Sequence, residues 1–231
     1  MPIGRLVAVA FAIALAACAP QVRPPASRAV APEGFPAQLY REAAAHGDAI
    51  YAIDPRSSLV VIEVRRAGAL ARLGHDHVVA SRDIEGFIWP GAGRADLYAP
   101  LDRLTVDEPA LRAEAHFDTH PSPEDIAGTR RNMLTRVLDT ERYPFVRIHV
   151  EGPVSGDPPT RVDVEVTLHG TTRSVSMPIE LLVRSTGIDA SGRLALRQND
   201  FGIEPLSILG GAIQVQDEIS LRFRLHAIRM Q

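Results

Sequence analysis

The sequence predicts an all-β fold in which about eight antiparallel strands close into a barrel. From Tyr51 onward, apolar and polar residues alternate with a period of two, as in strands with one dry and one solvated face. Only one interior stretch, residues 124–138, has helical spacing, and it supplies one short helix segment on a long connection. Closing the sheet removes exposed strand edges, although the alternation by itself also fits two sandwiched sheets. A barrel of this size has an interior that is filled by side chains or holds one small ligand.

The alternation is clearest near the end of the chain. The apolar positions there share one parity and the intervening positions are mostly polar or charged, the apolar set being Ile213, Val215, Ile219, Leu221, Phe223 and Leu225. The same pattern predicts strands over residues 59–64, 111–119, 145–150, 162–168 and 174–181.

Asp217 interrupts this pattern because its parity places a carboxylate on the apolar face. An unpaired carboxylate there would be costly, so the group has to be paired, hydrogen-bonded or neutral. Two interpretations stay open. Asp217 either anchors a ligand head group or accepts a hydrogen bond from His75 or His77, or else a bulge or a backbone hydrogen bond near the barrel mouth accommodates it.

Two segments have helical character. Pro123 suits the start of the interior helix and Pro144 prevents its continuation, and its apolar stripe consists of Ile126, Met133, Leu134, Val137 and Leu138. Residues 39–46 predict a short helix that packs at the edge of the domain or covers it as a lid.

The N-terminus has the features of a lipoprotein signal. Arg5 precedes an apolar run too short to span a bilayer, and the run ends in Leu15-Ala16-Ala17-Cys18, which matches the bacterial lipobox. We therefore expect a signal peptide over 1–17, an acylated Cys18 with a Pro/Ala-rich tether over 18–49, and a barrel domain over 50–231. Cys18 is the only cysteine, so no intrachain disulfide forms. Ala19 after the cysteine favours the outer membrane, with the protein facing the periplasm.

Composition excludes several functions. The net charge of −3 and pI near 6.2 argue against a broad nucleic-acid surface. The chain contains no lysine, which excludes Schiff-base chemistry and a Walker-type phosphate loop. No serine stands in a nucleophile-elbow context and no carboxylate pair stands out, so we predict no catalytic residues.

The segment GHDHVV (74–79) is the most distinctive local motif. On a strand, His75 and His77 share one face, as two ligands of zinc or copper would. A third ligand does not converge on them, because the strand parities turn the later histidines outward, namely His116, His120, His149, His169 and His226. We therefore expect the pair to make a hydrogen-bonded strand start or a polar ligand contact, and metal is the least favoured of the three interpretations.

Five short motifs in order resemble the YceI-like family of bacterial lipid- and polyisoprenoid-binding proteins over about residues 50–228. They are Tyr51-Ala52-Ile53-Asp54-Pro55 with Ser58, Val137-Leu138-Asp139 with Tyr143-Pro144, Val166 to Arg173 (VTLHGTTR), Asp200-Phe201-Gly202-Ile203, and Val215-x-Asp217. The resemblance implies an extended eight-stranded antiparallel lipocalin-like β-barrel with a helix near one end and a long apolar chain in its lumen. Ser57 and Asn132-Met133 depart from the family, where many members have histidine-containing counterparts, so a head-group contact by those histidines is not carried over.

Together these features predict a bacterial lipoprotein that binds a polyisoprenoid, quinone-like or fatty-acyl lipid in its lumen for periplasmic carriage or storage, without catalysis. The expected ligand-binding residues are His75, His77, Asp217, Phe201, Phe223 and Met133. The expected partners are this lipid and the membrane through the anchor, with no nucleic acid, and a homodimer is left open. A bound isoprenoid or quinone-like lipid is the only non-protein group expected. The alternatives are a metal- or redox-linked protein using His75 and His77, and a structural or stress-response lipoprotein whose lumen is packed shut.

Overall fold

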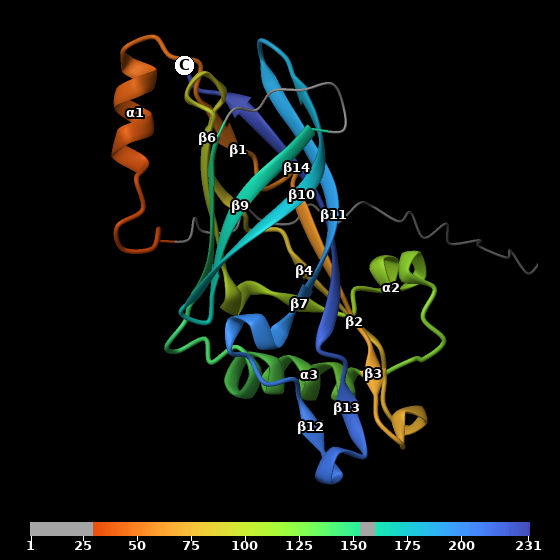
Figure 1. Cartoon of the computed structure of the whole chain (residues 1–231). Coiled ribbons are helices and arrows are strands. Elements are labelled where there is room, and N and C mark those ends of the chain that lie inside the picture. The colour runs from red at the N-terminus through yellow and green to blue at the C-terminus, as the bar shows by residue number, and fades with distance from the viewer. Residues whose placement is uncertain (1–29, 153–159) are drawn as a thin grey trace, which may run out of the picture.

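Eight strands pair side by side in a closed ring in the computed structural model, which describes residues 30–152 and 160–231 (Figure 1). In ring order they are β1 (Tyr51–Ile53), β5 (Glu85–Trp89), β6 (Arg94–Pro100), β8 (Phe145–Glu151), β9 (Thr160–Leu168), β10 (Thr171–Val183), β11 (Gly187–Arg197) and β14 (Glu218–Arg229). Strand β14 pairs back onto β1, with Ile53 opposite Ala227, and every ladder is antiparallel. The predicted eight-stranded antiparallel barrel is confirmed.

Three further strands widen the wall at the lower end of the barrel in Figure 1. Strand β2 (Leu59–Val64) pairs with the first half of β14, and β4 (His77–Ser81) and β7 (Thr105–Val106) follow it. A separate small sheet of β12 (Ser207–Ile208), β13 (Ile213–Val215) and β3 (Arg66–Ala67) projects below the barrel. The wall is therefore built from strands far apart in the sequence.

The predicted C-terminal strand is interrupted at Asp217, between β13 and β14. The carboxylate of Asp217 accepts a hydrogen bond from the backbone N–H of Asn199 at 2.9 Å, and its carbonyl accepts one from the N–H of Gln198 at 3.0 Å. These bonds attach the break to the 3₁₀ turn η5 (Gln198–Phe201). Of the two interpretations of Asp217, the structure thus shows the one in which a backbone hydrogen bond accommodates the carboxylate.

Helix α1 (Ala37–Ala45) lies against the outer face of the barrel, where the sequence predicts a short helix. The side chain of Tyr40 is completely buried, and its ring stacks on Phe87 of β5 with centroids 5.1 Å apart. Because Phe35 also packs in this cluster, the last part of the segment expected to be a tether (18–49) belongs to the folded unit.

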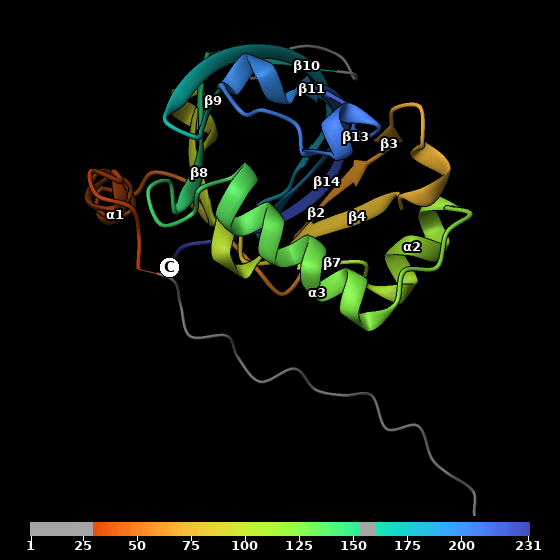
Figure 2. The ribbon, with the colours of Figure 1, turned by 90° about the horizontal axis from the view of Figure 1, so that it is seen from below.

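Helix α3 (Pro123–Asn132) continues into the π-helical turn η4 (Met133–Val137), so the predicted helix over 124–138 is confirmed. The hydroxyl of Ser122 and the carboxylate of Asp125 form a capping box, and Pro123 occupies the first turn, where its missing N–H has no cost. Seen from below, α3 crosses the lower end of the barrel (Figure 2).

The strand predicted over residues 111–119 is wrong, because residues Pro109–Ala115 form helix α2. Pro109 presets the backbone for a first helical turn, and Leu111 and Ala115 fall on one helical face at i and i+4. Leu111 packs against Val61 and Val78 on the outer face of β2 and β4. The alternation of apolar residues here has the period of a strand, but the spacing of Leu111 and Ala115 also fits one face of a helix. Packing against the outer face of β2 and β4 selects the helix.

The expected signal peptide, Cys18 and the first part of the tether lie outside the described residues. Among the residues that the structure describes, no helix is long and apolar enough to cross a membrane.

Candidate functional site

The barrel interior is lined mainly by aliphatic side chains, some buried and some half-buried. At the upper end, where β1 and β14 meet, the inward-facing residues are buried and pack together as one cluster, consisting of Tyr51, Ile53, Ile84, Leu97, Ala99, Ile188 and Ala227. This end is sealed by ordinary core packing.

Along the rest of the barrel and against this cluster, many inward-facing side chains are only half-buried. They include Val60, Ile62, Val64, Val146, Ile148, Met177, Leu194, Leu221, Phe223 and Leu225. Their register places them on the inner face, opposite the charged outward positions such as Arg222 and Arg224. Buried side chains lie among them on the inner faces of β9 and β10, namely Val162, Val164, Val166 and Ile179, so the inner face carries both buried and half-buried aliphatic side chains.

Phe223, one of the predicted ligand-binding residues, lies inside the barrel beside Gly192 of β11. A Cβ atom at Gly192 would lie 2.7 Å from Cζ of the Phe223 ring, which is closer than packed atoms approach. The glycine therefore provides the space in which this ring lies across the lumen.

The lower end of the lumen is covered by α3, η4 and η5 (Figure 2). Met133 packs with the cluster formed by Val79, Leu101, Leu104 and Val106. Phe201 is buried against the inner faces of β9 and β10. Both predicted residues thus lie at the lower end, on elements that cover the lumen.

The GHDH motif lies at this same end, with His77 as the first residue of β4. Its Nδ1 atom lies 2.6 Å from Oδ2 of Asp107, and its Nε2 atom lies 3.3 Å from the hydroxyl of Thr129 on α3. The His75 ring stands edge-on to the His77 ring at 6.0 Å. The motif therefore joins a strand of the wall to the helix that covers the lumen.

Asp107 is the centre of this network, and its side chain is completely inaccessible. Besides the contact with His77, its carboxylate accepts hydrogen bonds from the N–H of Val78 at 2.9 Å and from Nη1 of Arg112 at 2.6 Å. Burial raises the pKa of Asp107, but these hydrogen bonds outweigh burial and hold it below its ordinary value. The carboxylate is thus kept ionised and ties β4, β7 and α2 together.

His77 therefore has a different partner from the Asp217 that the sequence suggested, since Asp217 bonds the backbone of Asn199. Asp107 lies 30 positions away from His77, so no local pattern could have identified it. Arg112 lies on α2, in a segment for which the sequence predicts a strand. Within residues 30–152 and 160–231, no three or more His, Cys, Asp or Glu side chains form a group that could hold a metal ion.

Of the five later histidines predicted to face outward from strands, two do so and three lie outside the strands. His149 and His226 are on outward strand positions, and each bonds an aspartate at 2.7 Å, Asp96 and Asp189 respectively. His169 lies in the β9–β10 turn against Tyr143. His116 and His120 are exposed, but His116 ends helix α2 and neither is on a strand.

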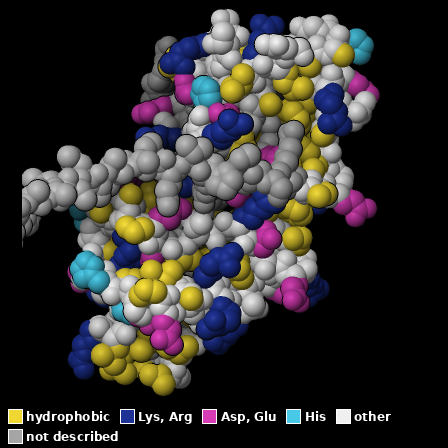
Figure 3. Space-filling view, turned by 180° about the vertical axis from the view of Figure 1, so that it is seen from behind, with side chains coloured by type: hydrophobic (Ala, Val, Ile, Leu, Met, Phe, Trp, Pro, Cys, Tyr) yellow, Lys and Arg dark blue, Asp and Glu magenta, His cyan; other side chains and the backbone are white. Residues whose placement is uncertain are grey.

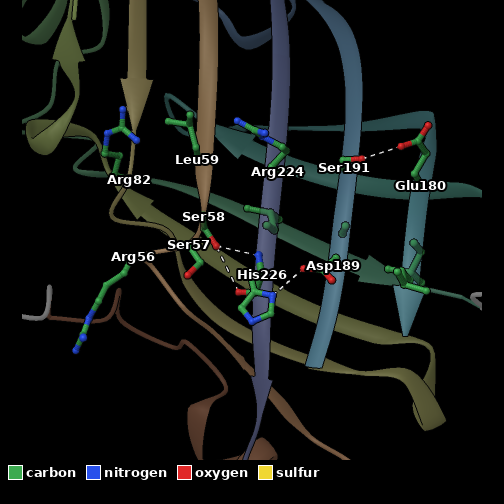
Figure 4. Close-up of a pocket in the computed structure, with 14 residues that line it drawn as sticks. Arg56, Ser57, Ser58, Leu59, Arg82, Glu180, Asp189, Ser191, Arg224 and His226 are labelled. Carbon is green, nitrogen blue, oxygen red and sulfur yellow. Dashed lines mark hydrogen bonds and ion pairs between the residues drawn. The ribbon is translucent and has the colours of Figure 1, made fainter. Parts of the chain in front are cut away.

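A separate pocket of about 640 Å³ opens on the outer face of β10, β11 and β14 (Figure 4). The His226 ring contacts Asp189, and Ser58 bonds only the backbone of His226, at 3.0 Å. Hydrogen bonds from His226 and Arg184 lower the pKa of Asp189. Ser191 donates to Glu180 at 3.1 Å. These polar groups connect neighbouring strands to each other, and the serine and histidine do not form a nucleophile–base pair.

Comparisons with known proteins agree with this architecture. Residues 51–227 match the model of the YceI-like domain. A polyisoprenoid binding domain from Saccharophagus degradans, implicated in plant cell wall breakdown, superposes with a TM-score of 0.56 at 14% identity, covering 78% of this chain and 98% of that one. BcnA from Burkholderia cenocepacia superposes with a TM-score of 0.51 at 12% identity, covering 75% of this chain and 98% of that one. No curated protein matches the chain. At these identities the solved structures show a shared fold.

Proposed function

The chain belongs to the YceI-like family, and from this premise we propose that it binds a long apolar lipid in its lumen and catalyses no reaction. The ligand class is a polyisoprenoid, a quinone-like lipid or a fatty-acyl lipid. The lipid is carried or stored in the periplasm by a protein that Cys18 anchors to the outer membrane. The printed description of the Saccharophagus degradans relative, a polyisoprenoid binding domain, supports this ligand class.

The observation that carries the proposal is the aliphatic lining of the barrel interior, part of which is only half-buried. Besides its buried clusters, the inner face carries aliphatic side chains that are only half-buried, such as Ile62, Leu194 and Leu221. An apolar chain that covered this surface would be stabilised by about 0.8 kcal/mol for each methylene removed from water. Few polar contacts are then needed, which suits a lining with so few polar groups.

The polar groups at the lower end suit a lipid head group. His75, His77 and Thr129 lie where α3 covers the barrel, so the apolar tail would extend upward from them toward Phe223. With Nδ1 directed at Asp107, the Nε2 atom of His77 faces the Thr129 hydroxyl on α3, and a head group at this end would meet these two polar groups.

Lipid extraction tests the proposal. Purified protein should release a near-stoichiometric apolar lipid that mass spectrometry identifies, or take up a fluorescent isoprenoid to the same extent. Leu194→Trp places a large ring on an inward position beside Leu221 and should lower the bound lipid severalfold. Ala195→Trp adds the same ring to the next position, which is exposed on the outer face, and should leave lipid binding unchanged. A folded wild-type protein that neither contains nor takes up lipid would contradict the proposal.

A further inference from the structure

The lower end of the molecule carries three strongly exposed aliphatic side chains on two adjacent loops. Leu73 in the 3₁₀ turn η1 (Ala71–Leu73) is 60% exposed, Ile208 at the end of β12 is 43% exposed, and Leu209 in η6 (Leu209–Gly211) is 70% exposed. We call these three residues the apolar tip. Single exposed aliphatic side chains are common on protein surfaces, whereas a cluster of them marks a surface that contacts another apolar phase.

The two loops form one structural unit. Strand β13 pairs with β3, with Ala67 opposite Gln214, and the N–H of Leu70 donates to the carbonyl of Ala212 at 2.8 Å. Gly68 has a φ of 93°, and a Cβ atom there would lie 2.5 Å from the same Ala212 carbonyl. The close approach therefore depends on this glycine and holds the two loops side by side.

The backbone at Leu209 indicates that its exposure is not incidental. Its φ is 52°, a left-handed conformation that glycine and asparagine tolerate and that is unfavourable for leucine. The following Gly210 has a similar φ of 64°. The loop thus retains a leucine at a position that local conformation disfavours, with its side chain directed into solvent.

The charge of the tip has one sign. Residues 65–74 and 205–216 contain Arg65, Arg66 and Arg72 and no aspartate or glutamate. Arg66 is bound to Asp118, at 2.9 Å, and Arg65 to Glu63, at 3.2 Å. Arg72 is exposed, and the described part of the chain offers it no ion-pair partner. In the view from behind, hydrophobic side chains gather at the lowest point of the molecule, with both arginine and acidic side chains beside them (Figure 3).

We propose that the apolar tip docks the protein on a bilayer with anionic head groups. Leu73, Ile208 and Leu209 enter the boundary between head groups and acyl chains, and Arg72 contacts lipid phosphates. A small projecting apolar tip with the exposed Arg72 beside it fits a bilayer surface better than a folded protein partner, which would need a larger contact area. The proposal extends the proposed function, because docking here brings the lower end of the lumen against a source of lipid. It does not require the lumen to be occupied.

Quenching by brominated lipid tests insertion residue by residue in the full chain. The only tryptophan, Trp89, is replaced by phenylalanine, and a new tryptophan is introduced as Leu209→Trp or Leu73→Trp. The control is Leu182→Trp, a 50% exposed leucine near the β10–β11 turn at the other end of the barrel. Each protein is reconstituted with vesicles of phosphatidylcholine and phosphatidylglycerol whose acyl chains carry bromine.

We expect at least a twofold loss of fluorescence at positions 209 and 73 and no loss at 182. Adding Arg72→Gln, or omitting phosphatidylglycerol, should weaken the quenching. Equal quenching at all three positions, or none at 209 and 73, would overturn the proposal. Lipid extraction from the same preparations reports the lumen separately. Bound lipid without quenching contradicts only the docking, and quenching without bound lipid contradicts only the lumenal function.

Discussion

The Nδ1 atom of His77 lies 2.6 Å from the carboxylate of Asp107, across 30 residues of sequence and under the helix that covers the lumen. This contact gives the GHDH motif a structural partner directly after β7, the strand that pairs with β4. It also leaves the other ring nitrogen of His77 facing Thr129 at the lower end of the barrel. Asp107 thus orients the His77 ring, and the ring faces helix α3.

Replacing Asp107 with asparagine should destabilise the protein by about 3 kcal/mol, since the change removes a buried charge that Arg112 and His77 both contact. Urea titrations measure the free energy of unfolding. The matched control is Asp118→Asn, which removes a carboxylate that is 71% exposed and pairs with Arg66, and it should cost less than about 1 kcal/mol. Equal costs for the two variants would contradict a central role for Asp107.

The same carboxylate predicts how stability depends on pH. Burial raises the pKa of Asp107, but hydrogen bonds from His77, Val78 and Arg112 outweigh it, so the folded pKa lies below the unfolded value of about 3.9. The unfolded chain then binds the proton more readily, and the stabilisation is present above the unfolded pKa and lost as the pH falls through the folded one. The stability difference between wild type and Asp107→Asn should therefore be largest above about pH 5 and shrink below about pH 4. A difference that persists unchanged at about pH 3 would show that the charge of Asp107 is not its source.

Helix α1 should depend on one buried hydrogen bond. The Tyr40 hydroxyl donates to Asp96 at 2.6 Å, and the same carboxylate contacts Arg94 and His149. Tyr40→Phe should lower the free energy of unfolding by about 2 kcal/mol and speed proteolysis of the α1 segment. The control is Tyr143→Phe, because the Tyr143 hydroxyl has no hydrogen-bond partner among residues 30–152 and 160–231. This variant should change stability by less than about 0.5 kcal/mol. Unchanged proteolysis in Tyr40→Phe would contradict this role.

Gly192 and Phe223 should be energetically coupled. A methyl group at Gly192 would lie 2.7 Å from the ring of Phe223, so Gly192→Ala should cost about 1–3 kcal/mol through overpacking. In a Phe223→Leu background the ring is absent, and the same glycine substitution should cost less by about 1 kcal/mol or more. A double-mutant cycle from urea titrations measures this difference. Strictly additive effects would mean that the ring does not occupy the space beside Gly192.

Acylation of Cys18 is tested in cells. Wild-type protein should incorporate labelled palmitate and sediment with the membrane fraction, because several acyl chains anchor a protein stably. Cys18→Ala should lose both the label and the sedimentation. A wild-type protein that is unlabelled, or a variant that keeps the label, would contradict the predicted lipobox.

The sequence by itself determined the elements whose signal is local. A period of two identified β2, β8, β9, β10 and β14, together with the side of each strand that faces the lumen, since neighbouring side chains on a strand alternate between its two faces. The stripe over residues 124–138 and the proline at its start identified α3 in the same way. The order of five motifs was enough to suggest the family that the comparison with the YceI-like domain then showed.

Only the tertiary structure decided the features that join distant segments. The outer face of β2 and β4 selects a helix at Pro109–Ala115, where the local pattern favours a strand. Asn199 accounts for the carboxylate of Asp217, and Asp107 pairs with His77, in each case through a hydrogen bond between residues far apart in the chain. The apolar tip likewise exists because β3 and β13 bring two loops together. Pairing across such distances is set by how the whole sheet closes, and no short stretch of sequence contains that information.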